Sequence, residues 1–248
     1  IAPEGIQFTH SLSDPILNDP EACAELDILG GHFYGWNGSS YPLAMEKGKE
    51  VWMTEFLINE RQEKQGINID WKTDAFLFAR NINDAMLANM SAWVHYSLKR
   101  YYGCIGDGQY GTVNGQVTKR GYILSHYAKY VSGTTRVKHS LNESSGNMTS
   151  SAYLSVTGDS LVVMVINPTS NAYSMTFNLP FHTLNGLSVS TTETANMKKD
   201  SFEFAEETYQ PELSVSASSV NTYIFVKSSE RDIDDEEQIG LDAMPNSE

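Results

Sequence analysis

Apolar positions follow two different periods, and the change between them divides the chain. Up to about residue 131, short apolar runs typical of buried strands alternate with segments in which apolar side chains recur every three or four residues. The strand-like runs are 25–35, 50–56 and 91–98, and the helix-like segments are 74–90 and 118–131. This alternation predicts a parallel α/β arrangement, which we assign to residues 1–136.

Further along, apolar and small polar residues alternate with a period of two. The alternating segments are 152–168, 172–180, 186–195, 202–207 and 219–227. Gly158-Asp159 interrupts the first of them and marks a hairpin turn. The pattern predicts an antiparallel β-sandwich over residues 137–227. The last residues, 228–248, are acidic with few apolar positions, which favours a mobile linker or tail.

Charge excludes two classes of partner. The formal net charge is −14, and half of it comes from eight acids and one arginine between Glu230 and Glu248. An acidic chain lacks the basic surface that nucleic acids and anionic membranes attract, so we expect neither as a partner. No apolar run approaches the length of a membrane span.

Cysteine and histidine usage predicts no metal site and no cofactor. Cys23 and Cys104 do not form a CxxC pair, and the six histidines show no ligand spacing. Two free thiols are the simpler reading, although the two cysteines could pair in an oxidising compartment.

Candidate chemistry gathers where the predicted parallel strands end. Glu55 closes the apolar run 51–54, His32 and Tyr34 follow the first strand, and Tyr96 to Tyr102 follow the third. Functional side chains of parallel α/β units collect at the carboxyl ends of the strands. An ionised carboxylate is costly to bury without a partner, so Glu55 is either a structural contact or a functional group.

Four motifs, in order along the chain, resemble the bacterial xylanases of glycoside hydrolase family 30, in the glucuronoxylanase branch. They are "SLSDPILNDPEACAELDILGGHFYG" (11–35), "VWMTEF" (51–56), "NDAMLANMSAWVHYSLKRYYG" (83–103) and "TKRGYILSHYAKYVSGTTRV" (118–137). The resemblance is close over residues 11–137 and looser to about residue 227. It implies the C-terminal part of a (β/α)8 barrel, holding strands six to eight, with an attached β side domain.

The resemblance also implies a retaining mechanism in which Glu55 is the nucleophile. The family carries its acid/base glutamate in an Asn-Glu-Pro motif, which this sequence lacks. Asn59-Glu60 and Asn142-Glu143 fit ordinary loops better. We therefore expect residue 1 to lie after the fifth barrel strand, and the acid/base to belong to a missing N-terminal half of the barrel.

Substrate-binding residues carry over only in part. His32 and Tyr34 match the family's His-x-Tyr-Gly, and Arg100 and Tyr102 match the run that holds a glucuronate carboxylate. Tyr96 stands where the family usually has Trp. Two family tyrosines are replaced, by Leu57 and Ser97, which makes neutral xylan or arabinoxylan a plausible substrate as well as glucuronoxylan. Trp93 fits the core, and Trp71 could line the cleft.

The resemblance implies secretion from a bacterium, because xylan lies outside the cell. Two other readings stay open. One is a non-catalytic carbohydrate-binding fragment, and the other is a family 30 glucosidase or β-1,6-glucanase. The motifs at 13–20 and 99–103 favour the xylanase branch.

Overall fold

The computed structural model describes residues 1–36, 38–59, 66, 69–142, 146–232 and 239–245. They form two compact units, one comprising Ile1–Ile69 with Asn81–Thr118 and the other Asp70–Arg80 with Lys119–Glu248. This division differs from the predicted one at residue 136. The reason is that helix α6 (Lys119–Tyr130) packs on strands β10 (Phe181–Thr192) and β13 (Ser219–Asp232) of the β-rich unit.

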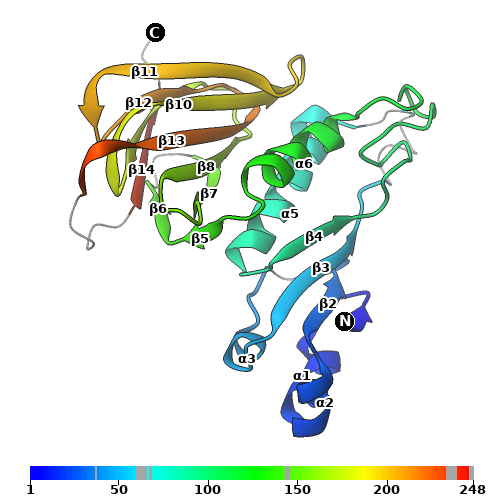
Figure 1. The fold of residues 1–248 in the computed structure, drawn as a ribbon. Coiled ribbons are helices and arrows are strands. Elements are labelled where there is room, and N and C mark those ends of the chain that lie inside the picture. The colour runs from blue at the N-terminus through cyan, green and yellow to red at the C-terminus, as the bar shows by residue number, and fades with distance from the viewer. Residues whose placement is uncertain (37, 60–65, 67–68, 143–145, 233–238, 246–248) are drawn as a thin grey trace. The chain divides into compact units, whose positions relative to one another are not determined.

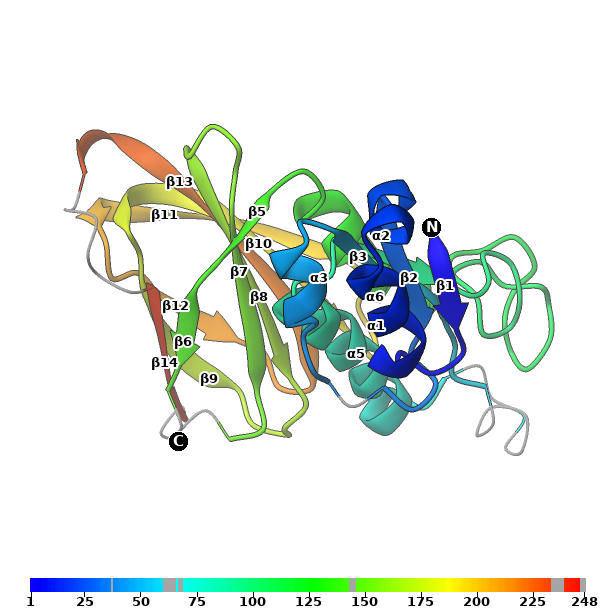
Figure 2. The ribbon, with the colours of Figure 1, turned by 90° about the horizontal axis from the view of Figure 1, so that it is seen from below.

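The first unit is built on a parallel sheet. Its strands run in the order β1-β2-β3-β4, and every neighbouring pair is parallel (Figures 1 and 2). The strands are β1 (Ala2–Gly5), β2 (Ile28–His32), β3 (Glu50–Phe56) and β4 (Ala92–His95). The three predicted strands are confirmed, but the count of three is wrong. Residues 2–5 form a fourth strand, β1, which pairs with β2. The expectation that the strand preceding β2 lies outside these 248 residues is therefore wrong.

Three short helices of this unit were not predicted from the hydrophobic pattern. They are α1 (His10–Asn18), α2 (Pro20–Glu25) and α3 (Pro42–Glu46). Local capping explains the second: Asp19 accepts hydrogen bonds from the backbone N–H groups of Glu21 and Ala22 at 3.0 and 2.9 Å, and Pro20 suits the first helical position.

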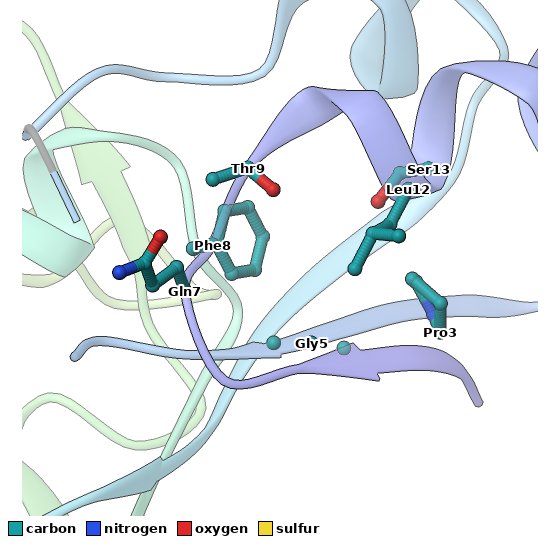
Figure 3. Close-up of a pocket in the computed structure, with 9 residues that line it drawn as sticks. Pro3, Gly5, Gln7, Phe8, Thr9, Leu12 and Ser13 are labelled. Atoms are coloured by element: carbon teal, nitrogen blue, oxygen red, sulfur yellow. The ribbon is translucent and has the colours of Figure 1, made fainter. Parts of the chain in front are cut away.

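Strands β2 and β3 contribute side chains to a close-packed apolar cluster, which forms the core of the first unit. Leu17, Leu29 and Met53 are almost fully buried in it. Phe8, labelled in Figure 3, lines a small cavity beside β1. Its ring packs against Gly31 so closely that a Cβ on Gly31 would lie 2.3 Å from it. The cavity beside these residues measures about 10 Å³, which holds at most one water, so it is not a ligand site.

The second unit contains two sheets that share one core. One sheet has the order β11-β10-β13-β8-β7-β5 and the other β12-β9-β14-β6. The strands not yet given are β5 (Thr135–Val137), β6 (His139–Leu141), β7 (Thr149–Leu154), β8 (Ser160–Asn167), β9 (Tyr173–Asn178), β11 (Lys198–Thr208), β12 (Glu212–Val215) and β14 (Ile239–Pro245). Apolar side chains from both sheets, among them Val163, Phe177 and Phe225, form a single buried cluster.

Most of the predicted β pattern is confirmed. Strands β7 and β8 form the expected antiparallel hairpin, with Gly158 at a positive φ of 73° in the turn. The predicted tail is partly wrong, because β13 continues to Asp232 and residues 239–245 form β14. Backbone pairing with β9 and β6 orders Ile239–Pro245, a segment that holds only one of the tail's eight acids, Asp242.

The two predicted helices are present. Residues 74–90 contain helix α5 (Phe76–Leu87), preceded by a π-helical turn η1 (Trp71–Ala75), and α6 covers the second. Trp71 is 5% exposed, and its Nε1 donates to the Ser218 carbonyl at 3.1 Å. Trp71 is therefore a core residue of the second unit. In the part of the chain that the structure describes, no helix has the length and apolar character of a membrane span.

Candidate active site

Glu55 lies at the carboxyl end of β3, one of the two inner strands of the parallel sheet. Met53 and Phe56 on either side of it are buried, and its own side chain is 34% exposed. The ladder between β2 and β3 shifts between Gly31 and His32, and this irregularity pairs His32 with Glu55. The apolar strand thus holds the carboxylate at a partly open edge, where it can meet a ligand.

Tyr34 and His32 both face this carboxylate. The Tyr34 hydroxyl donates to Glu55 Oε1 at 3.2 Å, and His32 Nδ1 lies 3.9 Å from the same oxygen. Burial, followed by the negative charge and hydrogen bond of Glu55, raises the pKa of Tyr34 well above its usual value. Tyr34 therefore stays a neutral donor, and it holds one oxygen of Glu55 in place.

Glu4 is a neighbour that the sequence analysis missed. Its Oε2 accepts a hydrogen bond from Thr54 Oγ1 at 2.5 Å and lies 3.5 Å from His32 Nε2. The contact with Thr54 joins residues 50 positions apart, and β1 is too short to show a periodicity. Only the strand order, which sets β1 beside β2, brings Glu4 to this edge.

The loop after β4 contributes the second predicted cluster. Tyr96 N donates to the Phe56 carbonyl at 3.1 Å, so Tyr96 emerges at the same edge as Glu55. The rings of Tyr96 and Tyr102 are stacked with centroids 6.4 Å apart, and the Arg100 guanidinium lies 5.7 Å from the Tyr102 ring centroid. His95 Nε2 is 2.9 Å from the Tyr102 carbonyl and ties the loop back to the strand.

Exposure differs sharply within this cluster. Tyr96 is 48% exposed and offers an open aromatic face, whereas Tyr102 is 8% exposed and supports it from below. Arg100 is half exposed, and its Nε lies 3.9 Å from Asp107 Oδ2. Asp107 is held in turn by the backbone N–H of Gln109 at 3.1 Å. Trp93 packs edge-on against Phe33 and Phe56, as expected of a core residue.

The structure therefore brings the six predicted site residues into two groups at one edge. Glu55, His32 and Tyr34 form the acidic group, and Tyr96, Arg100 and Tyr102 form the aromatic-cationic group. Glu60 and Glu143, the two glutamates of the Asn-Glu pairs, lie outside the described residues. Among the described residues, no group of three His, Cys, Asp or Glu side chains could hold a metal ion.

Sequence and structure comparisons agree on the relatives. The chain is 36% identical over 186 residues to glucuronoxylanase XynC of Bacillus subtilis strain 168, a match that covers 72% of this chain and 41% of the relative. A second B. subtilis glucuronoxylanase XynC is 34% identical over the same length. No protein-family model matches the chain.

Solved structures extend the likeness to both units. A family 30 endoxylanase from Clostridium papyrosolvens C71 superposes with a TM-score of 0.76 at 29% identity, over 91% of this chain and 55% of that one. The subfamily 8 xylanase Xyn30A of Clostridium acetobutylicum gives 0.77 at 28% identity, with the same coverage. The chain is homologous to the glycoside hydrolase family 30 xylanases over most of its length. The resemblance carried by the sequence motifs is thereby confirmed.

This chain corresponds to only part of each relative. The chain spans 41% of the length of the B. subtilis enzymes and about half of the Clostridium structures. A more distant structure, the catalytic domain of xylanase C from Talaromyces cellulolyticus, matches at 16% identity with a TM-score of 0.68 and supports the fold alone. The family 30 fold agrees with part of a barrel followed by a β-rich domain.

Proposed function

We propose that this chain is the nucleophile-bearing part of a retaining endo-β-1,4-xylanase. The observation that carries the proposal is the position of Glu55, which ends an inner parallel strand with a hydrogen bond from Tyr34 and with His32 alongside. Homology to family 30 xylanases supports xylan as the substrate class. In this proposal β1 to β4 are barrel strands five to eight, and the two-sheet unit is the β-sandwich side domain.

The chemistry follows from a carboxylate fixed beside an anomeric carbon. Glu55 attacks that carbon as the bond to the leaving sugar oxygen breaks, and an acid/base glutamate gives this oxygen a proton. Water then attacks the glycosyl ester, returns a proton to the acid/base, and releases Glu55. The neutral Tyr34 hydroxyl keeps the attacking carboxylate oriented through both steps.

The test is the stereochemistry of the reaction. The full-length protein that contains this chain is incubated with β-1,4-xylan, and proton NMR follows the new reducing ends. The β-anomer should form first, because two displacements restore the configuration. Early formation of the α-anomer, or cleavage of β-1,6-glucan in place of xylan, would contradict the proposal. Binding to xylan without any cleavage would favour the carbohydrate-binding alternative.

The acid/base glutamate is proposed to lie in a part of the protein outside these 248 residues. The reason is the missing Asn-Glu-Pro motif. In a retaining enzyme the two carboxyl groups are about 5 to 5.5 Å apart. A barrel half upstream of β1 would complete the cleft and cover the exposed apolar side chains of the first unit, which include Ile6, Leu12, Val94 and Leu98.

Residues 1–248 expressed alone are therefore expected to show no xylan hydrolysis and poor solubility. The described part of the parallel sheet ends in the unpaired edges of β1 and β4, and such edges promote association. Reducing-sugar release and size-exclusion chromatography measure the two outcomes. Hydrolysis by the isolated chain would show that the second carboxylate lies within it.

Specificity depends on the Arg100 group. A guanidinium suits the carboxylate of a glucuronic acid substituent, and Arg100 with Tyr102 is our candidate for that contact. Asp107 already faces Arg100, and Leu57 and Ser97 provide no tyrosine hydroxyls. We infer that the enzyme accepts glucuronate substituents without requiring them. Its substrate would be extracellular xylan, and the protein a secreted bacterial one.

Arg100→Ala is expected to lower kcat/KM on glucuronoxylan about two- to fivefold, because one solvent-exposed ion pair is lost. The rate on linear xylan should change less than twofold. Asp107→Asn removes the negative charge that faces Arg100. It should raise kcat/KM on glucuronoxylan relative to kcat/KM on linear xylan, since Arg100 then loses its ion-pair partner within the protein. An equal effect of Arg100→Ala on both substrates would exclude a contact with the uronate.

A further inference from the structure

Glu4 stands in an unusual backbone setting at the end of β1. Its φ is +61°, in the left-handed region that residues other than glycine rarely adopt. The ladder between β1 and β2 shifts register between Pro3 and Gly5, on either side of Glu4. Irregularities of this kind redirect a side chain at the rim of a sheet. Here the result is a carboxylate that lies over the neighbouring strand β2.

The neighbouring strands accommodate that carboxylate. A Cβ at Gly30 would lie 2.2 Å from Glu4 Oε1, so the bare glycine leaves the space that the carboxylate occupies. From β3, the Thr54 hydroxyl donates to Glu4 Oε2 at 2.5 Å. The Glu4 side chain is still 40% exposed. It is thus fixed by specific contacts, rather than by burial, beside the proposed nucleophile.

His32 connects Glu4 to Glu55. Its Nε2 lies 3.5 Å from Glu4 Oε2, and its Nδ1, on the other side of the same ring, lies 3.9 Å from Glu55 Oε1. The ring is only 20% exposed and packs edge-on against Tyr34 with centroids 6.1 Å apart. One acidic partner on each side sets the rotation of the imidazole about its side-chain bonds.

We propose that Glu4 is a positioning residue for the nucleophile and acts through His32. This inference rests on the proposed function of Glu55. Glu4 Oε2 lies beside His32 Nε2 and so holds the ring with Nδ1 facing Glu55, while the Tyr34 hydroxyl donates to the same Glu55 oxygen.

Glu4→Ala in the full-length protein should lower kcat on xylan about tenfold, because the His32 ring loses the contact that orients it toward Glu55. KM should stay within twofold, because Glu4 does not contact the sugar. Glu4→Gln keeps an acceptor oxygen of the same reach and should recover most of the lost rate. Glu50→Ala removes a glutamate from the other end of β3 and should leave kcat unchanged.

A double variant separates positioning from general support of the fold. If Glu4 acts through His32, Glu4→Ala should cost no further activity in a His32→Ala background. Additive losses, or a Glu4→Gln variant as slow as Glu4→Ala, would overturn the inference.

A crystal structure of Glu4→Ala tests the positioning step without an assay. We expect the His32 ring to rotate away from Glu55, and an unmoved ring would contradict the role. If the parent protein does not cleave xylan, the proposed function fails, while the ring rotation still decides whether Glu4 orients His32.

Discussion

Glu55→Gln should reduce xylan hydrolysis by the full-length protein more than about one-hundredfold, because an amide cannot form the glycosyl ester. Gln has the shape of Glu and can still accept the Tyr34 hydrogen bond, so the fold of the strand should survive. Initial rates of reducing-end release measure the loss. A variant that keeps more than about one-hundredth of the parent rate would show that Glu55 is not the nucleophile.

Glu50→Gln is the matched control, since Glu50 lies at the start of the same strand, where its Oε2 accepts a hydrogen bond from the Trp52 indole at 2.8 Å. Its rate should equal that of the parent.

A 2-deoxy-2-fluoro-xyloside inactivator gives a second readout, because it traps the covalent intermediate. Mass spectrometry should find the label on the peptide that contains Glu55, and a label on another carboxylate would reassign the nucleophile.

The sequence predicted those parts of the fold that repeat a regular pattern. Strands β2 and β3 and helices α5 and α6 are long enough to show their period, and the alternation in β7 to β10 is equally plain. Strand β1 has four residues, including Pro3 and Gly5, and its pairing with β2 depends on residues more than 20 positions away. No local signal marks such a strand.

The candidate site likewise combines residues that the sequence predicted with residues that it did not. Glu55, His32 and Tyr34 could be selected because each follows a recognisable strand, and the family motifs assigned their roles. Glu4 belongs to the strand that was missed, and its partners Thr54 and His32 come from β3 and β2. The Arg100–Asp107 pair depends on how the loop after β4 folds back, which composition does not specify.

The tail shows a limit of composition. Eight acids in the last nineteen residues favour disorder, yet the backbone of Ile239–Pro245 pairs with β9 along six residues. Strand β14 lies between β9 and β6 and holds only one of those acids, Asp242, so the charge averaged over the whole tail concealed a segment that can pair through its main chain.

His126 makes the second unit acid-sensitive. It is fully buried on α6 between two hydroxyls, Thr222 Oγ1 at 2.7 Å from Nδ1 and Thr191 Oγ1 at 2.9 Å from Nε2. Burial disfavours the charged imidazolium and lowers the pKa of His126 from 6.5 to about 3. Below pH 6.5 the His126 imidazole therefore binds a proton in the unfolded chain but not in the folded unit. The free energy of unfolding consequently decreases as pH falls from about 6.5 toward 3.

The expected loss over that window is on the order of 4 kcal/mol for the parent protein. Hydrogen exchange of the α6 and β13 peptides, corrected for intrinsic rates, measures the opening free energy at pH 7, 5 and 4. His126→Gln retains a donor and an acceptor for the two threonines but cannot titrate, so its opening free energy should fall much less. Some decrease of the opening free energy with falling pH should remain in this variant, because burial also lowers the pKa of His139.

His182→Gln is the control, because His182 is partly exposed and stacks on Tyr209 in the same unit. It should keep the acid sensitivity of the parent. If the opening free energies of the parent and of His126→Gln decrease equally with falling pH, another group causes the acid response. A flat response in the parent would mean that the buried imidazole is solvated when protonated, for instance by water entering between α6 and β13. The comparison thus decides whether the Thr191–His126–Thr222 contact tolerates charge.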